Sequence, residues 1–535
     1  MAAAAAAGGW TPERSVAGGR NPWSIIAVIS IATFMEVLDT SIANVALNHI
    51  AGGLSASIDE AAWVITTFLV ANAVVIPISG WLADVFGRKP YYMASVALFT
   101  ASSLMCGLST SLPMLIAARI LQGLAGGGLA PVEQSMMVDT FPPAKRGLAF
   151  AAYGVVVIVG PVLGPSLGGW ITDNFSWHWV FLINVPIGIL SLVLVTLFVE
   201  EPKVLKRETA RIRRKGVSFD IVGFALVALF LGCLEVTLDR GQRDDWFSSG
   251  LITTTALICI VCFLAFIPWE LSRKEPIVNI RLFNNRNFAI SNLFMVIMGL
   301  IIFGTTQFIP QLLQQVLGYT ATNAGLALTA GGMATLVMMP LAGFLSSRVD
   351  ARILIGMALL VQGVALWNMA GLNSQISFHD AAVARMIQAF ALPFVFVTIS
   401  NIAYVGVNQK DNNQASALMN VSRNLGGTFG ISLVQTMLAR QSQVHQSQYV
   451  ETLNPLNPNY TRGISQIAHQ LMAHGMPQAQ AMGAASAQLY RSLGRQALML
   501  SYIDVFHVLM WVVFAAVPLV LLLRKGKPGG GEGAA

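Results

Sequence analysis

Charged side chains are scarce in this chain of 535 residues, because Asp, Glu, Lys and Arg together make up 11% of it. Soluble domains carry about 25% charged residues, so this composition excludes a soluble domain of ordinary size. Hydrophobic residues account for 55% of the chain, and its mean hydropathy is +0.66. These values predict an all-α integral membrane protein whose apolar helices cross the lipid bilayer many times.

Cysteines and clustered metal ligands are also scarce, which argues against several kinds of site. The four cysteines, Cys106, Cys233, Cys259 and Cys262, lie inside apolar runs and are predicted to pack rather than to form disulfides. We find no phosphate-binding loop and no His, Asp or Glu set at metal-ligand spacing, so we expect neither an enzyme nor a cofactor or metal site. The net charge of +7 is spread over short loops and does not indicate a nucleic-acid partner.

Apolar runs long enough to cross a bilayer recur along the chain, separated by short polar breaks. Residues 1–22 lack the pattern of a cleaved signal peptide, so the first helix is expected to be retained. We predict about fourteen spans, at residues 23–48, 61–82, 90–109, 113–137, 147–170, 178–199, 219–238, 250–270, 288–316, 323–346, 353–371, 380–406, 414–438 and 501–523. Lys and Arg concentrate in the tails and in the loops after even-numbered spans, which predicts that both termini are cytoplasmic.

An internal repeat divides the chain into two halves. Residues 119–123, Arg-Ile-Leu-Gln-Gly, are echoed at 385–389 by Arg-Met-Ile-Gln-Ala, and Gly-Trp-Leu at 80–82 is echoed by Gly-Phe-Leu at 343–345. The two echoes have nearly the same offset, and parallel halves of this kind build many secondary transporters. We therefore predict a cytoplasmic tail (1–22), a six-helix bundle (23–199), a cytoplasmic loop with two inserted helices (200–286), a second six-helix bundle (287–523) and a cytoplasmic tail (524–535).

Two loops are unusual for their length or charge. The outer loop at 440–500 is long for a connection, which suggests binding or gating, although a solvated spacer is the alternative. Within it, residues 475–483 are typical of a turn followed by an amphipathic helix. The loop at 200–218 is rich in Lys and Arg, and anchoring of the topology is sufficient to explain it, with a lipid headgroup contact as the alternative.

The first predicted span carries two carboxylates. Glu36 and Asp39 are three residues apart, so both project from the same side of a helix. A carboxylate in the hydrocarbon core costs about 2.5–3.5 kcal/mol even on lenient scales, so this side is expected to face the protein or a wet cavity. There the two groups can take up and release protons; the alternative is a pair of structural hydrogen bonds to a neighbouring helix.

The fourth predicted span carries an arginine, which needs an acceptor inside a membrane. Arg119 cannot lose its proton, but it can influence the protonation of a carboxylate nearby. Glu133 follows at close to four helical turns and so faces roughly the same way, and Pro131 between them is expected to kink the helix. We predict that Arg119 modulates the protonation of Asp39 or Glu133, the alternative being a static buried pair.

The turn between the second and third spans predicts a cytoplasmic gate. Gly80 and Gly87 permit a tight turn and close helix approach, while Asp84 and Arg88 are four residues apart. These two side chains can pair with each other, or Asp84 can meet a helix N-terminus across the interface between the halves. Simple anchoring by positive charge is the alternative.

The fifth span contains a stripe of small residues. Gly160, Gly164 and Gly168 recur every four residues, with Pro165 and Gly169 beside them, which favours close packing against another helix.

Further polar and aromatic residues are candidates for the lining of a substrate cavity on the grounds of helix face. They are Phe34, Asn44, Phe68, Asn72, Gln122, Phe303, Gln307, Gln311, Arg385, Asn420 and Arg423. Residues 412–438 contain no Asp or Glu, so any partner of Arg423 must come from another segment. Glu235 lies near the outer end of the seventh span and is expected to reach toward the membrane surface.

These motifs together resemble the major facilitator superfamily. Residues 80–89 resemble its signature after the second helix, residues 119–123 its fourth-helix motif, and residues 160–169 its fifth-helix motif of antiporters. Residues 38–47 resemble the first-helix motif of the fourteen-span drug:proton antiporters. The similarity is closer still to EmrB-type multidrug exporters, through stretches at 141–146, 183–188, 238–241, 245–249, 276–278, 310–314, 318–322 and 454–459.

The resemblance implies a proton-coupled antiporter in the inner membrane of a Gram-negative bacterium, exporting amphipathic drugs without a cofactor. It also implies a periplasmic membrane-fusion adaptor and an outer-membrane channel as partners, with the 440–500 loop as an adaptor contact. Glu36 and Glu133 depart from the family, where polar uncharged residues are expected, and Ala389 and Ser347 replace the glycine and aspartate of the first-half motifs.

Two other functions are open at this point. One is a proton-coupled exporter or symporter of one specific metabolite or fatty acid, and the fifth-helix Gly-Pro pattern argues against the symporter. The other is a membrane sensor or enzyme that transports nothing, and no motif supports it.

Overall fold

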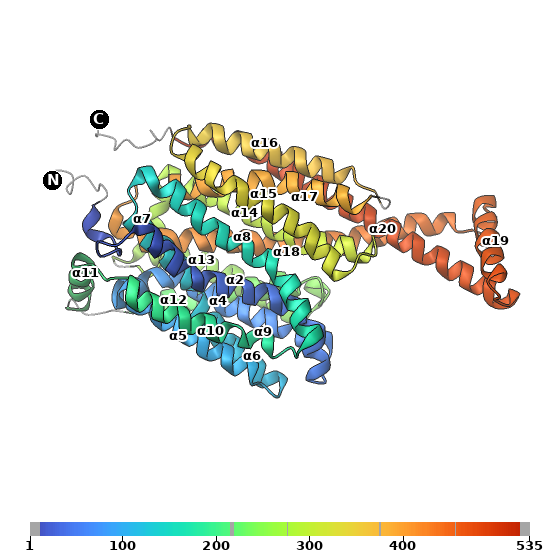
Figure 1. Cartoon of the computed structure of the whole chain (residues 1–535), viewed down its shortest axis with the longest axis horizontal. Coiled ribbons are helices and arrows are strands. Elements are labelled where there is room, and N and C mark those ends of the chain that lie inside the picture. Colours follow the sequence, from blue (N-terminus) through green and yellow to red (C-terminus); the bar gives the residue numbers. More distant parts are fainter. Residues whose placement is uncertain (1–10, 215–218, 275, 374–375, 455, 525–535) are drawn as a thin grey trace.

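The computed structural model describes residues 11–214, 219–274, 276–373, 376–454 and 456–524, and the chain is helical throughout these ranges apart from short connections (Figure 1). Fourteen long helical stretches in them match the fourteen predicted spans. Twelve of these are long and apolar enough to cross a membrane. The other two, α5 (Arg88–Gly107) and α18 (Asn412–Thr452), are more polar and pack within the bundle. The predicted all-α membrane fold is confirmed.

The first half contains six long helical stretches, three of which are interrupted or preceded by a short helix. They are α2 (Pro22–Gly53), α3 (Ile58–Ala61) with α4 (Trp63–Phe86), α5, α6 (Leu112–Gly126) with α7 (Leu129–Thr140), α8 (Pro143–Asn174), and α9 (Trp179–Leu182) with α10 (Asn184–Phe198). The short helix η1 (Pro12–Arg14) precedes them.

The rest of the chain supplies an amphipathic helix, two inserted helices and the second half. These are α11 (Lys203–Arg214), α12 (Ile221–Arg240), η2 (Trp246–Ser248), α13 (Gly250–Ser272), η3 (Ile280–Asn284), α14 (Arg286–Gln315), α15 (Ala321–Ser346), α16 (Ala351–Ala370), α17 (Phe378–Ile402), η4 (Gln409–Asp411), α18, α19 (Pro458–Ala473), α20 (Gln478–Ala516) and η5 (Pro518–Leu522).

Local sequence explains several helix boundaries. The Asn21 side chain accepts a hydrogen bond from the backbone N–H of Trp23, which caps the start of α2. Gly87, with φ of +90°, is the single residue between α4 and α5, a conformation that residues with a Cβ rarely adopt. The helix is interrupted at Gly127–Gly128, one turn before Pro131, whose missing N–H cannot bond the Gly127 carbonyl oxygen, so the predicted kink takes the form of this break.

The two halves contact each other mainly through α8 with α15 and through α4 and α7 with α18. Small residues permit this approach. A Cβ built on Gly343 of α15 would lie 3.0 Å from the Gly147 carbonyl oxygen of α8. A Cβ on Gly80 of α4 would lie 3.0 Å from the backbone of Asn413 in α18. The inserted helix α12 packs against α4 and α18, outside this seam.

The segment at 440–500, predicted as a long loop, is mostly helical. α18 and α20 extend beyond the bundle, and α19 joins them at the far end of the protrusion (Figure 1). A turn at Gly475, where φ is +89°, leads into α20. Ala481 and Ala485 on α20 pack with Ile464 and Ala468 on α19, which gives the protrusion a small apolar core of its own.

Candidate functional site

The carboxylate of Asp39 lies at the centre of a buried network formed by three helices of the first half. Asp39 on α2 is fully buried and accepts hydrogen bonds from Arg119 Nη1 (2.5 Å), Gln122 Nε2 (3.0 Å) and Asn184 Nδ2 (2.7 Å). Arg119 and Gln122 are on α6, and Asn184 begins α10. We call these four residues the Asp39 network. Both oxygens of the carboxylate thus have hydrogen-bond donors.

The guanidinium of Arg119 is held on several sides. Its Nε donates to the Val64 carbonyl oxygen at 3.1 Å, and its Nη1 also donates to Gln122 Oε1 at 2.6 Å. The guanidinium carbon lies 4.1 Å from the ring centroid of Phe68 and 5.5 Å from that of Phe181. Removing one partner of such a buried ion pair destabilises a protein by about 3–5 kcal/mol. A change in the charge of Asp39 therefore acts directly on the side-chain link between α2 and α6.

Glu36 lies one turn before Asp39 and makes a separate contact. Its Oε1 accepts from Asn72 Nδ2 of α4 at 2.8 Å, and its side chain is partly exposed. Arg423 of α18 is close enough to act electrostatically on Glu36, although it belongs to the second half. Two of the Arg423 nitrogens, Nε and Nη1, are buried without a hydrogen-bond partner in the part of the chain that is described. Arg423 thus acts on Glu36 electrostatically from the other half.

Glu133 forms a third buried carboxyl site, away from Arg119. Its oxygens lie 2.6 Å from Thr33 Oγ1 and 2.9 Å from the hydroxyl of Tyr92. Arg119 and Glu133 both face α2, where their partners are Asp39 and Thr33 respectively. Of the two predicted partners, Arg119 pairs with Asp39.

The predicted gate residues lie at the end of the bundle where the described chain begins and ends, which we call the terminal end (Figure 1). Asp84 accepts a hydrogen bond from Asn413 in the first turn of α18. Arg88 forms an ion pair with Asp139 of α7, and Asn412 donates to the same carboxylate at 2.7 Å. Of the two predicted arrangements, the structure has the one in which Asp84 meets a helix N-terminus of the other half. The bonds of Asn412 and Asn413 join the two halves at the terminal end.

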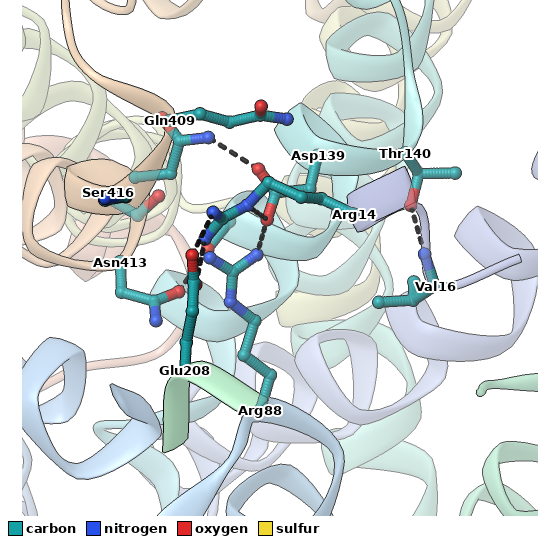
Figure 2. Close-up of polar contacts among 12 residues, drawn as sticks. Arg14, Val16, Arg88, Asp139, Thr140, Glu208, Gln409, Asn413 and Ser416 are labelled. Carbon is teal, nitrogen blue, oxygen red and sulfur yellow. Dashed lines mark hydrogen bonds and ion pairs between the residues drawn. The ribbon is translucent and has the colours of Figure 1, made fainter. Parts of the chain in front are cut away.

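The segment before α2 contacts residues of this end of the bundle through Arg14 and Val16 (Figure 2). Arg14 lies 3.9 Å from Asp139 and forms two hydrogen bonds of 2.8 Å with the carboxylate of Glu208 on α11. The Val16 backbone N–H donates to Thr140 Oγ1 at 3.4 Å. The N-terminal segment and α11 are therefore tied to the residues that join the halves.

The glycine stripe of α8 packs on α2. Added Cβ atoms at Gly160 and Gly164 would lie 2.8 Å from Val37 and 2.2 Å from Ser41 Oγ. A Cβ on Gly168 would also contact α2, with its nearest atom at 3.1 Å, whereas one on Gly169 would have nothing within 4 Å. Pro165 lies inside the continuous helix α8. The stripe thus positions the α2 segment that carries Asp39.

The residues predicted to line a cavity fall into separate environments. Phe68 and Gln122 are buried around the Asp39 network, and Asn72 is bonded to Glu36. Asn420 is also buried, and its Nδ2 donates to Gln134 Oε1 of the other half at 2.9 Å.

Other members of this set are more accessible. Phe34 and Gln311 are half-buried, while Asn44 and Phe303 are exposed. The side chain of Gln307 lies outside the described part of the structure.

Glu235 differs from the sequence expectation. It was expected to reach toward the membrane surface, but its side chain is buried and accepts from Thr428 Oγ1 of α18 at 2.8 Å. The helix α12 packs against α18 at this point, so a local partner is available where the sequence showed none.

Sequence reasoning missed several partners in these sites. Asn184 and Tyr92 supply buried bonds to the intramembrane carboxylates, and Asp139 and Asn413 join the terminal end. A polar residue inside an otherwise apolar run was the available signal for Asn184. The run of amides at 412–414 before a predicted helix was the signal for Asn413.

The chain matches the family model described as Major Facilitator Superfamily over residues 29–431. It is 39% identical over 511 residues to the multidrug export protein EmrB of Escherichia coli (strain K12), covering 95% of this chain and 96% of that protein. It is 34% identical over 505 residues to the fatty acid resistance protein FarB of Neisseria gonorrhoeae, covering 94% and 96% of the two chains.

Solved structures are similar in fold at low sequence identity. The proton:xylose symporter XylE matches with a TM-score of 0.58 and 14% identity, covering 93% of this chain and 96% of that one. The human organic anion transporter MFSD10 matches with a TM-score of 0.54 and 12% identity, covering 92% and 99%. These likenesses bear on the fold alone.

Proposed function

Since the chain belongs to the major facilitator superfamily, and within it to the EmrB-type multidrug exporters, we propose that it is a proton-driven antiporter of amphipathic drugs. The observation that carries this proposal is the buried Asp39 network, in which one carboxylate joins α2 to α6 and α10. A group that can gain and lose one proton at such a junction can couple a proton to helix movement. The proton gradient then supplies the energy, and no cofactor is needed.

The proposed cycle starts from the conformation described above. We assign the terminal end to the cytoplasm, because Lys and Arg concentrate on that side. The closure around Asp84 and Asn413 then corresponds to a form that is shut toward the cytoplasm. A proton arriving from the outer side neutralises Asp39, weakens its bond to Arg119 and releases α6 from α2. One proton moving down 100 mV supplies about 2.3 kcal/mol, enough to change the populations of two conformations substantially.

The protrusion at the end of the bundle opposite the terminal end is the basis for the proposed protein partners. With the terminal end in the cytoplasm, the helical segment formed by α18, α19 and α20 projects into the periplasm (Figure 1). Its length and separate apolar core suit a contact with a periplasmic membrane-fusion adaptor, which would connect the exporter to an outer-membrane channel. We place the chain in the inner membrane with both termini cytoplasmic.

The test uses purified full-length protein in proteoliposomes with an imposed pH gradient and ethidium as the transported cation. We expect Asp39→Asn to abolish gradient-driven ethidium movement, because the amide cannot take up the proton. Glu235→Gln is the matched control, since it removes another buried carboxylate from the membrane region, and it should keep transport. Undiminished transport by folded Asp39→Asn would refute the assignment.

A second candidate is export of one metabolite or fatty acid. The 34% identity to a protein named for fatty acid resistance favours it. Competition between ethidium and unrelated amphiphiles separates the two, because a drug exporter accepts several of them and a dedicated transporter accepts one. The direction of flux under an imposed proton gradient separates export from symport.

A further inference from the structure

The second half repeats three of the four positions of the Asp39 network. Arg385, Gln388 and Thr305 each stand 266 residues after a member of the Asp39 network (385 − 119, 388 − 122 and 305 − 39). Arg385 Nη1 donates to Gln388 Oε1 and, at 3.3 Å, to Thr305 Oγ1. Gln388 Nε2 lies 3.2 Å from the same hydroxyl oxygen. These three contacts correspond to those among Asp39, Arg119 and Gln122, and Asn184 has no counterpart among them. A neutral hydroxyl stands where the first half has the carboxylate of Asp39.

This substitution leaves a buried positive charge without a negative partner. Arg385 is 6% exposed, and its Nε has no hydrogen-bond partner among the residues that the structure describes. The sequence contains no Asp or Glu between residues 276 and 349, which include all of α14 and α15. On α17 itself the single acidic residue is Asp380, in an exposed capping box at the start of the helix. A desolvated arginine is costly unless an anion compensates it.

The surroundings of Arg385 indicate what kind of anion fits. Its Nη2 donates to Thr306 Oγ1 at 3.1 Å, and Thr306 is partly exposed, so this edge of the guanidinium lies near accessible surface. Phe303 is one turn away on the same helix and is 39% exposed. A guanidinium fork suits a carboxylate, and an exposed aromatic ring one turn from Thr306 on α14 suits an apolar chain.

We infer that Arg385, with Thr305 and Thr306, binds the carboxylate of an amphipathic acid, which supplies the negative charge that Asp39 supplies in the first half. This inference rests on the proposed export function and adds a substrate class to it. Decanoate is the probe, because it combines a carboxylate with an apolar chain, and decanol is its neutral counterpart.

The test compares two substitutions of similar size at one position in the purified full-length protein. Thr305→Asp gives Arg385 an internal carboxylate and should weaken decanoate binding roughly tenfold to a hundredfold, while decanol binding stays unchanged. Thr305→Asn adds no charge and should retain decanoate binding within about threefold. Arg385→Gln serves as a second variant that should lose decanoate binding if Thr305→Asp proves unstable. Decanoate binding that is equal in wild type, Thr305→Asp and Arg385→Gln would overturn the inference.

Adding excess chloride tests whether the site also binds inorganic anions. Competition between chloride and decanoate supports an anion site that inorganic ions share, and unchanged decanoate binding supports a site selective for carboxylates. Transport assays separate this inference from the proposed function. Wild-type protein that moves no ethidium under a pH gradient would contradict the exporter itself and leave the decanoate measurement to decide the anion site.

Discussion

The hydroxyl oxygen of Tyr92 lies 2.9 Å from Oε1 of Glu133 and 2.6 Å from the carbonyl oxygen of Ile29. A phenol has one proton and can donate it to one of these two acceptors. When it donates to the carbonyl oxygen, the contact with Glu133 requires that Glu133 donates its own proton to the phenol. The geometry therefore favours a neutral, protonated Glu133 in this conformation.

The protonation of Glu133 can be measured by infrared difference spectroscopy at neutral pH. The spectrum of wild type minus Glu133→Gln should contain a carboxylic-acid carbonyl band, because the substitution removes a protonated group. Glu60→Gln is the control, since Glu60 is an exposed carboxylate and should contribute ionised-carboxylate bands. Ionised-carboxylate bands in the Glu133 difference spectrum would show that the neutral form is wrong.

Gly80 tests the closure of the terminal end. A Cβ at this position would lie 3.0 Å from the Asn413 backbone, so Gly80→Leu should overpack the seam between the halves. Overpacking costs about 1–3 kcal/mol, which lowers the ratio of closed to open molecules roughly fivefold or more. Spin labels at the exposed positions Phe86 and Val405 should then report longer distances.

Gly356→Leu is the matched control for this experiment. Gly356 lies on α16, where an added Cβ meets nothing within 4 Å, and the label distances should match those of the wild type. If Gly80→Leu leaves the distances unchanged as well, the contact between Gly80 and Asn413 does not hold the terminal end shut.

Arg14 tests the N-terminal segment. Arg14→Ala removes the contacts with Asp139 and Glu208 and should loosen the segment. Hydrogen bonds to charged groups contribute about 1.5–3 kcal/mol, so trypsin cleavage after Arg20 should accelerate about tenfold or more. Glu13→Ala changes an exposed neighbour in η1 and should leave the cleavage rate unchanged. Equal rates in both variants would show that Arg14 does not secure the segment.

Much of the fold could be predicted from the sequence because apolar runs of spanning length define helices almost directly. The pairing of Asp39 with Arg119 could also be anticipated, since an intramembrane arginine needs an acceptor and few are available. The bonds of Glu133 to Thr33 and Tyr92 could not, because those partners lie on other helices, and which helix Glu133 faces depends on tertiary packing.

Partners that come from distant segments were beyond the sequence. Asn184 of α10 donates to Asp39 of α2, and Asn413 of α18 donates to Asp84 of α4 across the boundary between the halves. The sequence predicted a surface position for Glu235, but α12 packs against α18, where Thr428 is the partner of Glu235. In each case a polar residue was visible in the sequence, but the helix it faces depends on tertiary packing.

The proton carried by Asp39 can be followed most directly in proteoliposomes that contain a trapped pH indicator. With no imposed pH gradient, an ethidium gradient across the membrane should drive protons in the opposite direction in the wild type. In Asp39→Asn the ethidium gradient should drive no proton movement, although the folded protein can still bind ethidium. Proton counterflow in folded Asp39→Asn at the wild-type rate would contradict the account.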